Sequence, residues 1–179
     1  MMTWHEVGCC RSPLIKELHE IWSRKRGGAE LARRADFDPA EMKRLLPNLL
    51  IVDLERDPFR ARYRLVGTKV VAASGYDFTG RYLDEIDLAS GAEQWTSQYA
   101  DLCGSGRPLF GSADLPTVDG GRFTYEFGIF PVTTDGRSVN QCLEIEDYGA
   151  FNERLFELQH KVETWRPPPI TTKKWGGEP

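Results

Sequence analysis

The sequence predicts an α+β domain in which helices cover one face of a five-stranded antiparallel sheet. Two β-rich runs near the start are separated by turn residues, and three more β-rich runs follow in the second half. Segments with helical spacing lie between these two groups of strands. Because hairpin connections make neighbouring strands antiparallel, and helices must bury their apolar sides, the helices are expected to pack on the sheet. Amphipathic helices are expected before and after this core.

Length and composition fit one folded domain with short appended segments. The chain has 179 residues, of which 28% are charged and 40% are hydrophobic, close to the averages of globular proteins. Its net charge is -4 and its basic residues are scattered among acidic ones, so no nucleic-acid partner is expected. No apolar run has the length of a signal-peptide core or a membrane helix, which predicts a cytoplasmic protein without a membrane contact.

Residues 1–35 are predicted to form a helical extension. Ser12 and Pro13 start a helix, because serine caps free amides and proline fits the first helical position. The apolar residues that follow share one side of this helix: Leu14, Leu18, Ile21 and Trp22. This stripe must pack either on the domain or on a second copy of the chain, and the sequence leaves both open.

The core is predicted over residues 36–148 and opens with a short helix and a hairpin. In "DFDPAEMKRLLPN", Asp38 and Pro39 are predicted to start the helix and Pro47 to end it. The runs "LLIVDLE" (49–55) and "ARYRLVG" (61–67) flank the turn residues of "RDPFR", which predicts two paired strands.

Alternation in the second strand assigns its side chains to faces. Tyr63 and Leu65 alternate with Arg62 and Arg64, so the tyrosine and the leucine are predicted to face the core. The two arginines are expected on a solvated or partner-facing surface, although guanidinium groups are also able to hold a carboxylate.

The stretch "LVGTKVVAASGYDFTG" (65–80) is predicted to be a corner between a strand and a short helix. Gly67 permits the turn, Thr68 is expected to cap the helix, and Asp77 and Gly80 close the stretch with a polar turn. A phosphate-binding loop is disfavoured, because lysine does not directly follow the last glycine and no GxGxxG motif is present.

A second helix and three strands complete the predicted core. "SGAEQWTSQYADLCGSG" has helical spacing, with Ser90 as a start signal and Gly106 as a stop. Strands are predicted in "LFGSADL", "RFTYEFGIFPV" and "SVNQCLEIED", joined by hairpin turns. An amphipathic helix is expected over 149–165, and residues 166–179, rich in proline and glycine, are expected to be a flexible tail.

This order of elements, together with "RYRLVGTKVVAASGYDFTGRYLDEI", resembles the PAS domain, a sensory module. The resemblance covers roughly residues 36–147, and the chain looks like a short, stand-alone bacterial member of the family. Gly75, Tyr76 and Gly80 match a glycine and tyrosine that typically end the short PAS helix, followed by a later glycine. The resemblance implies a pocket between the sheet and the helices.

The sequence does not name a cofactor for this pocket, but it disfavours several. His5, His19 and His160 all lie outside the predicted core, so a histidine-ligated haem is not expected. The cysteine that binds flavin in light-sensing relatives lies in an "NCRFLQ"-like helix, and Cys103 has no such neighbours. No spacing of His, Cys, Asp or Glu suggests a metal site, and the cysteines are expected to be reduced packing residues.

Periodic aromatic residues give the candidate ligand-binding set. The expected inner faces of two strands and one helix bring together apolar and hydroxyl-bearing side chains, as in small-molecule pockets. Six residues are predicted to line the pocket: Tyr63, Leu65, Trp95, Tyr99, Tyr125 and Phe127. The same spacing is also typical of an ordinary hydrophobic core.

The sequence therefore predicts a non-catalytic sensory module that binds a small organic ligand and signals through a homodimer or a partner signalling protein. A scaffold of the same fold without a ligand is the first alternative. A small isomerase or lyase that uses Asp53, Tyr125 or Glu126 is the second, although no nucleophile or paired-carboxylate motif is present.

Overall fold

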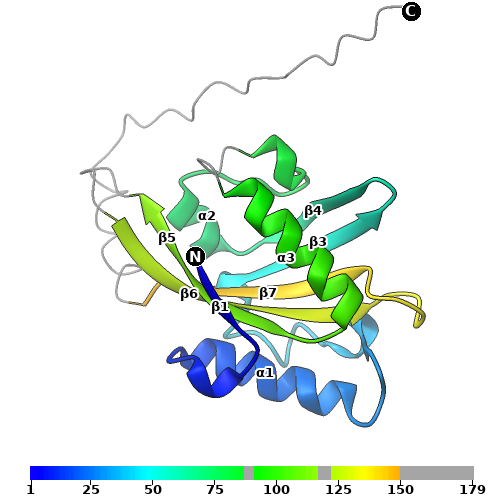
Figure 1. Cartoon of the computed structure of the whole chain (residues 1–179). Helices are drawn as coiled ribbons and strands as arrows, with labels where there is room; N and C mark the ends of the chain where they lie inside the picture. The colour runs from blue at the N-terminus through cyan, green and yellow to red at the C-terminus, as the bar shows by residue number, and fades with distance from the viewer. Residues whose placement is uncertain (87–90, 117–121, 150–179) are drawn as a thin grey trace, which may run out of the picture.

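The computed structural model describes residues 1–86, 91–116 and 122–149, and in this part of the chain seven strands form one sheet (Figure 1). The strand order is β1-β5-β6-β7-β3-β4, and β2 pairs in parallel with β6 while the other pairs are antiparallel. The strands are β1 (Met2–Trp4), β2 (Ala32–Arg33), β3 (Leu49–Arg56), β4 (Phe59–Val66), β5 (Leu109–Pro116), β6 (Arg122–Thr133) and β7 (Gln141–Asp147). The helices are α1 (Pro13–Arg26), α2 (Thr68–Ser74) and α3 (Ala92–Ser105), with short 3-10 turns η1 (Val7–Cys9), η2 (Arg34–Asp36), η3 (Leu46–Asn48) and η4 (Leu83–Glu85).

The predicted fold class is confirmed, and the N-terminal segment adds to it. The five predicted strands are β3 to β7, and β3 and β4 form the expected hairpin. Two further short strands, β1 and β2, come from the first 35 residues and pair with β5 and β6. The closing helix and the tail predicted after residue 149 lie outside the described residues.

The core helices α2 and α3 cover one face of the sheet, as predicted, and the N-terminal helix α1 covers the opposite face (Figure 1). Ser12 caps α1 by accepting a hydrogen bond from the Ile15 amide at 3.2 Å, and Pro13 is the first helical residue. The predicted stripe is buried at Leu18, Ile21 and Trp22, with Ile15 in addition, and it packs on β6 and β7. The apolar stripe of α1 therefore packs on its own domain, which is one of the two arrangements that the sequence left open.

The segment before β3 is not the predicted α-helix but a series of turns that ends in η3. The side chain of Asp38 accepts a hydrogen bond from the Ala40 amide at 2.8 Å, which stabilises a local turn in place of a helical start. Only seven residues separate Pro39 from Pro47, too few to repay the cost of helix nucleation. Met42 and Leu45 are nevertheless buried under α1, as an apolar side requires.

The corner between β4 and α2 depends on close backbone approach at Gly67. A Cβ atom at this position would lie 2.4 Å from the Pro47 carbonyl oxygen, which leaves no room for any other residue. Gly67 itself is the N-cap of α2, so the predicted capping role of Thr68 is wrong and Thr68 is the first helical residue. The polar turn is confirmed, since Asp77 accepts from the Thr79 amide at 2.9 Å and Gly80 has a φ of 86°.

Two hydrophobic clusters result, one on each face of the sheet. The outer cluster lies between α1 and the sheet, and the inner cluster lies between the sheet and α2, α3 and the segment around η4. Residues of α3 reach into the inner cluster at Trp95, Tyr99 and Leu102, as their helical spacing predicts. No helix in the described part of the chain is long and apolar enough to cross a membrane.

Candidate functional site

The inner cluster brings together five of the six predicted ligand-binding residues. Trp95 and Tyr99 come from α3, Tyr63 from β4, and Tyr125 and Phe127 from β6, and all are buried. The Trp95 ring packs against Phe127 with centroids 4.7 Å apart and against Tyr99 at 6.2 Å. Their convergence is a feature of the fold, while their contact with a ligand stays a prediction.

Leu65 is not part of this cluster, so its predicted place on the inner face is wrong. Its side chain is 38% exposed. In the hairpin, Ile51 of β3 pairs with Leu65 of β4, and the next residue, Val52, pairs with Tyr63. Arg64 therefore has no partner across the hairpin and forms a β-bulge. Such a bulge reverses the alternation, and Leu65 then lies opposite Ile51, a residue of the outer cluster.

Two buried glutamates, which the sequence did not single out, face the same space from β7. Glu144 is 2% exposed and Glu146 is 8% exposed. They alternate with Leu143 and Ile145, which belong to the outer cluster. An alternating acid and apolar pattern is typical of a half-solvated strand. β7 departs from it because it lies in the middle of the sheet with helices on both faces.

The burial of these two acids could be predicted from the sequence only together with knowledge of the fold. β7 pairs with β3 and β6 in the middle of the sheet, so α1 covers the face with Leu143 and Ile145, and α2 and α3 cover the face with the two acids. Since the sequence left the place of the N-terminal helix open, it did not show that both faces of this strand are buried.

Tyrosine hydroxyls surround both carboxyl groups. Tyr99 donates a hydrogen bond to Glu144 Oε2 at 2.5 Å, and Tyr148 donates to Glu146 Oε2. Tyr125 also forms a hydrogen bond with Glu146. Burial raises the pKa of both glutamates well above the ordinary value, and for Glu144 the charge of Glu146 raises it further, while the tyrosine hydrogen bonds act in the opposite direction. The surroundings therefore favour the protonated form of both carboxyl groups.

A small cavity of about 60 Å³ lies beside these acids. Side chains from the sheet, α2, α3 and the residues on both sides of η4 enclose it, and they are mostly apolar or aromatic. Its lining consists of Leu50, Tyr63, Val70, Ser74, Phe78, Ile86, Trp95, Leu115, Tyr125, Glu144, Glu146 and Tyr148. We call this space the inner cavity; Tyr99 and Phe127 pack beside it rather than lining it.

An open groove of about 610 Å³ lies next to the inner cavity and shares part of its wall. The groove is bordered by β1, the start of α1 and the ends of β6 and β7. Tyr125 and Tyr148 line both spaces, and their ring centroids are 5.1 Å apart. The inner cavity and the groove therefore adjoin at these two residues.

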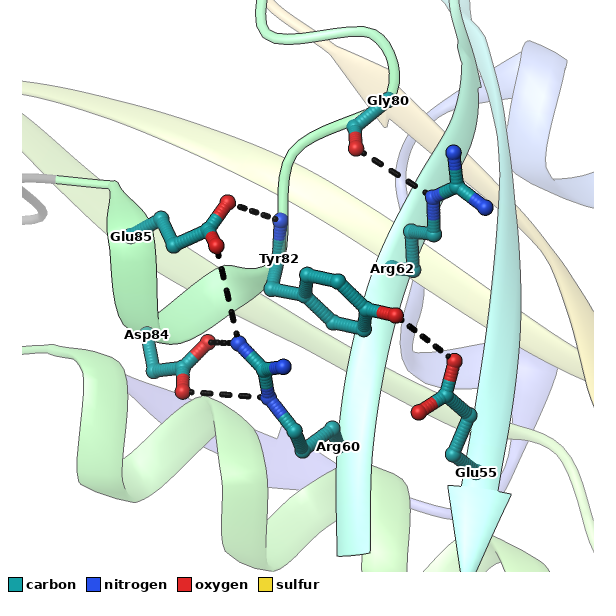
Figure 2. Close-up of polar contacts among 7 residues, drawn as sticks. All are labelled: Glu55, Arg60, Arg62, Gly80, Tyr82, Asp84 and Glu85. Carbon is teal, nitrogen blue, oxygen red and sulfur yellow. Dashed lines mark hydrogen bonds and ion pairs between the residues drawn. The ribbon is translucent and has the colours of Figure 1, made fainter.

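A polar cluster around Tyr82 holds another wall of the cavity against the β3–β4 hairpin (Figure 2). Tyr82 donates a hydrogen bond to Glu55 at 2.9 Å, and the guanidinium of Arg60 lies 3.6 Å from the centre of the Tyr82 ring. Arg60 also binds Asp84 at 2.8 and 3.2 Å, and Glu85 accepts from the Tyr82 amide at 3.1 Å. The cluster fixes the segment that carries the wall residues Phe78 and Ile86.

Replacing Tyr82 with alanine is expected to lower the free energy of unfolding by about 1–2 kcal/mol, because the ring contacts and the Glu55 bond are both lost. Tyr82→Phe keeps the ring and should cost about 0.5 kcal/mol. Urea denaturation measures both, and Arg81→Ala, at an exposed neighbour, serves as the control. Equal stability of the Tyr82→Ala and Arg81→Ala proteins would contradict the assigned role of Tyr82.

The other polar candidates from the sequence lie outside the inner cavity. Asp53 accepts from Arg64 at 2.9 Å and from the Gln141 side chain at 2.6 Å, at the β3–β4 side of the sheet. Glu126 accepts from the Ser12 amide at 2.7 Å and also binds the Arg11 amide, at the start of α1. Among the three residues considered for catalysis, only Tyr125 lines the inner cavity.

Arg62 and Arg64 are exposed, as expected from the strand pattern. Arg62 donates to the Gly80 carbonyl at 3.2 Å and lies near the Tyr82 ring (Figure 2). Both arginines thus form polar contacts at the surface of the hairpin, Arg62 with Gly80 and Arg64 with Asp53.

In the part of the chain that the structure describes, the histidine and cysteine residues lie away from the acids, with the exception of Cys142; His160 lies outside the described residues. His19 packs on Phe110 and Phe130 in the outer layer, closer to the core than the sequence suggested but on the face opposite to the inner cavity. The four cysteines are free, and Cys142 is buried in the inner cluster. Within residues 1–86, 91–116 and 122–149, no group of three His, Cys, Asp or Glu residues is arranged to hold a metal ion.

Comparison with known proteins identifies the family. A family model described as "PAS domain" matches residues 10–141. No curated protein matches the chain.

Solved structures of similar fold include the PAS domain of an HTR-like protein from Haloarcula marismortui, at 21% identity and a TM-score of 0.41, covering 60% of this chain and 94% of that chain. The PAS domain of BvgS from Bordetella pertussis is 18% identical with a TM-score of 0.40, covering 72% and 98%. A PAS domain from Colwellia psychrerythraea is 13% identical with a TM-score of 0.43, covering 63% and 98%.

Proposed function

The chain belongs to the PAS domain family, whose members are generally sensory and signalling modules, and we propose that it senses a small organic ligand bound in the inner cavity. The observation that carries this proposal is the inner cavity itself. It combines aromatic and apolar walls with two buried carboxyl groups and several phenols, which is the composition of small-molecule sites. Two buried acids are not expected in a core that serves packing alone, because burying each carboxyl group costs free energy of desolvation.

Access to the cavity is proposed to run from the open groove past Tyr125 and Tyr148. These two residues belong to the linings of both spaces, so a change of their side-chain torsions would join the two volumes. Both rings are buried, so they must rotate out of their present packing for a ligand to pass. No movement of the sheet is then required for a ligand to enter.

Transmission of the signal is proposed to follow β7 to α1. Glu146 faces the cavity, and the next residue, Asp147, accepts a hydrogen bond from the Ser12 hydroxyl at 2.5 Å. Ser12 is also the cap of α1. A shift of β7 on ligand binding therefore acts on the start of the helix that covers the outer face. A homodimer or a partner signalling protein would respond to that change.

Native and denaturing mass spectrometry of the protein as purified test the ligand, together with a thermal-shift screen of a metabolite panel. We expect extra mass that is lost on denaturation, or a compound that raises the melting temperature. Tyr125→Phe, which removes a hydroxyl of the cavity, should weaken this binding, whereas Leu65→Ala, on the exposed surface, should leave it unchanged. A protein that binds nothing in either experiment would instead favour a ligand-free scaffold.

A further inference from the structure

Building on the proposed ligand-binding function, we propose that the inner cavity takes a compact organic cation, an alkylammonium group held between Glu144, Glu146 and the surrounding aromatic rings. The proposal rests on the charge, the wall and the size of this one cavity.

The charge of the cavity is the first argument. Neither Glu144 nor Glu146 takes part in any ion pair found within the described residues. The remaining titratable groups that face them come from β4, α3, β6, β7 and the residue after β7, and all are neutral donors: Tyr63, Tyr99, Tyr125, Cys142 and Tyr148. A buried carboxylate without a cation is costly, so the pair is either protonated or balanced by a positive charge from outside the chain.

The wall of the cavity is the second argument. The side chains of Tyr63, Phe78 and Trp95 present aromatic rings to the same space, and Tyr63 and Phe78 meet edge to face at 4.8 Å. Aromatic faces attract cations, and rings combined with carboxylates are typical of sites for alkylated ammonium groups. An anion would meet two acids and no basic side chain among the lining residues, while a purely apolar ligand would offer the carboxyl groups no partner beyond the tyrosines that already bind them.

The size of the cavity is the third argument. A volume of about 60 Å³ accommodates a group of only a few heavy atoms. Methylammonium and trimethylammonium are of this scale. A larger ligand would be expected to place only its cationic end in the inner cavity and to extend between Tyr125 and Tyr148 into the groove.

Binding of a cation is expected to release a proton. Both carboxyl groups are held protonated by burial, and a positive charge beside them favours the ionised form. The proton leaves from a glutamate carboxyl to the buffer, and the cation replaces its charge. Binding should therefore tighten as the pH rises through the neutral range.

Isothermal titration calorimetry of the full chain with trimethylammonium and methylammonium tests this, in buffers of different ionisation enthalpy. We expect saturable binding with release of about one proton per cation at neutral pH. The neutral compound tert-butanol and the anion acetate, of similar size, should bind weakly or not at all. Glu144→Gln and Glu146→Gln should each weaken cation binding by about tenfold or more, while Glu93→Gln, at an exposed position on α3, should leave it unchanged.

The outcomes separate this inference from the proposed function. Binding of the cations without proton release, or equal binding by tert-butanol, would overturn the assignment to Glu144 and Glu146. If neutral or anionic metabolites bind and the ammonium compounds do not, the assignment of a cationic ligand is wrong and the proposed sensory function stands. If no compound of any charge binds, both fail. The proton count uses the wild-type protein, so it decides the question even where a glutamine variant does not fold.

Discussion

Replacing Glu144 with glutamine is expected to stabilise the folded protein at about pH 8 and to flatten the dependence of its stability on pH. Burial raises the pKa of Glu144 from its ordinary 4.5 to about 8, and that of Glu146 to about 7. Between the ordinary pKa of 4.5 and these raised values, the folded protein holds protons on the two glutamates that the unfolded chain has released. Stability is therefore fully present below about pH 4.5 and is lost as the pH rises through the raised values.

Glutamine keeps the shape of the side chain and still accepts a hydrogen bond from Tyr99, but it has no charge to desolvate. The stability of Glu144→Gln relative to wild type should therefore improve by about 2 kcal/mol or more between pH 5 and pH 8. Urea denaturation across this range measures the difference. Glu93→Gln is the matched control at an exposed position, and its curve should run parallel to that of the wild type. A parallel curve for Glu144→Gln as well would contradict a raised pKa.

Replacing Leu18 with alanine is expected to lower the free energy of unfolding by about 2–5 kcal/mol, since Leu18 is fully buried between α1 and the sheet. Lys16→Ala, at an exposed position of the same helix, should cost less than about 0.5 kcal/mol. Denaturant unfolding measures both.

The same variants test the packing of α1 on its own chain against a contact with a second copy. Because the helix packs on its own chain, the loss caused by Leu18→Ala should not depend on protein concentration. A loss that shrinks or grows with concentration would show that a second copy covers the stripe, and a negligible loss would show that α1 does not pack on the sheet. The proposed transmission of a signal from β7 to α1 depends on this contact.

The elements with a strong period and clear end signals could be predicted from the sequence. Ser12 and Pro13 gave the start of α1, and turn residues gave the β3–β4 hairpin. The helix predicted after Asp38 failed because local hydrogen bonds and two nearby prolines compete with helix formation over so short a segment.

The candidate site could be predicted only in part. Alternation and helical spacing placed Tyr63, Trp95 and Tyr125 at the cavity, because these residues lie in regular elements. Leu65 was misplaced, since a bulge changes the face of a residue without any mark in the sequence. Glu144 was missed because α3 buries its face of β7 while α1 buries the opposite face, so an alternating pattern does not mark an exposed face here.

The most direct test of the acid pair as a cation site is a carbon-13 NMR titration of the glutamate carboxyl groups, with and without trimethylammonium. We predict that the signals of Glu144 and Glu146 titrate well above the ordinary glutamate pKa in the free protein, and that the cation lowers both titration midpoints. Titration of both groups near the ordinary pKa, unchanged by the cation, would contradict the account.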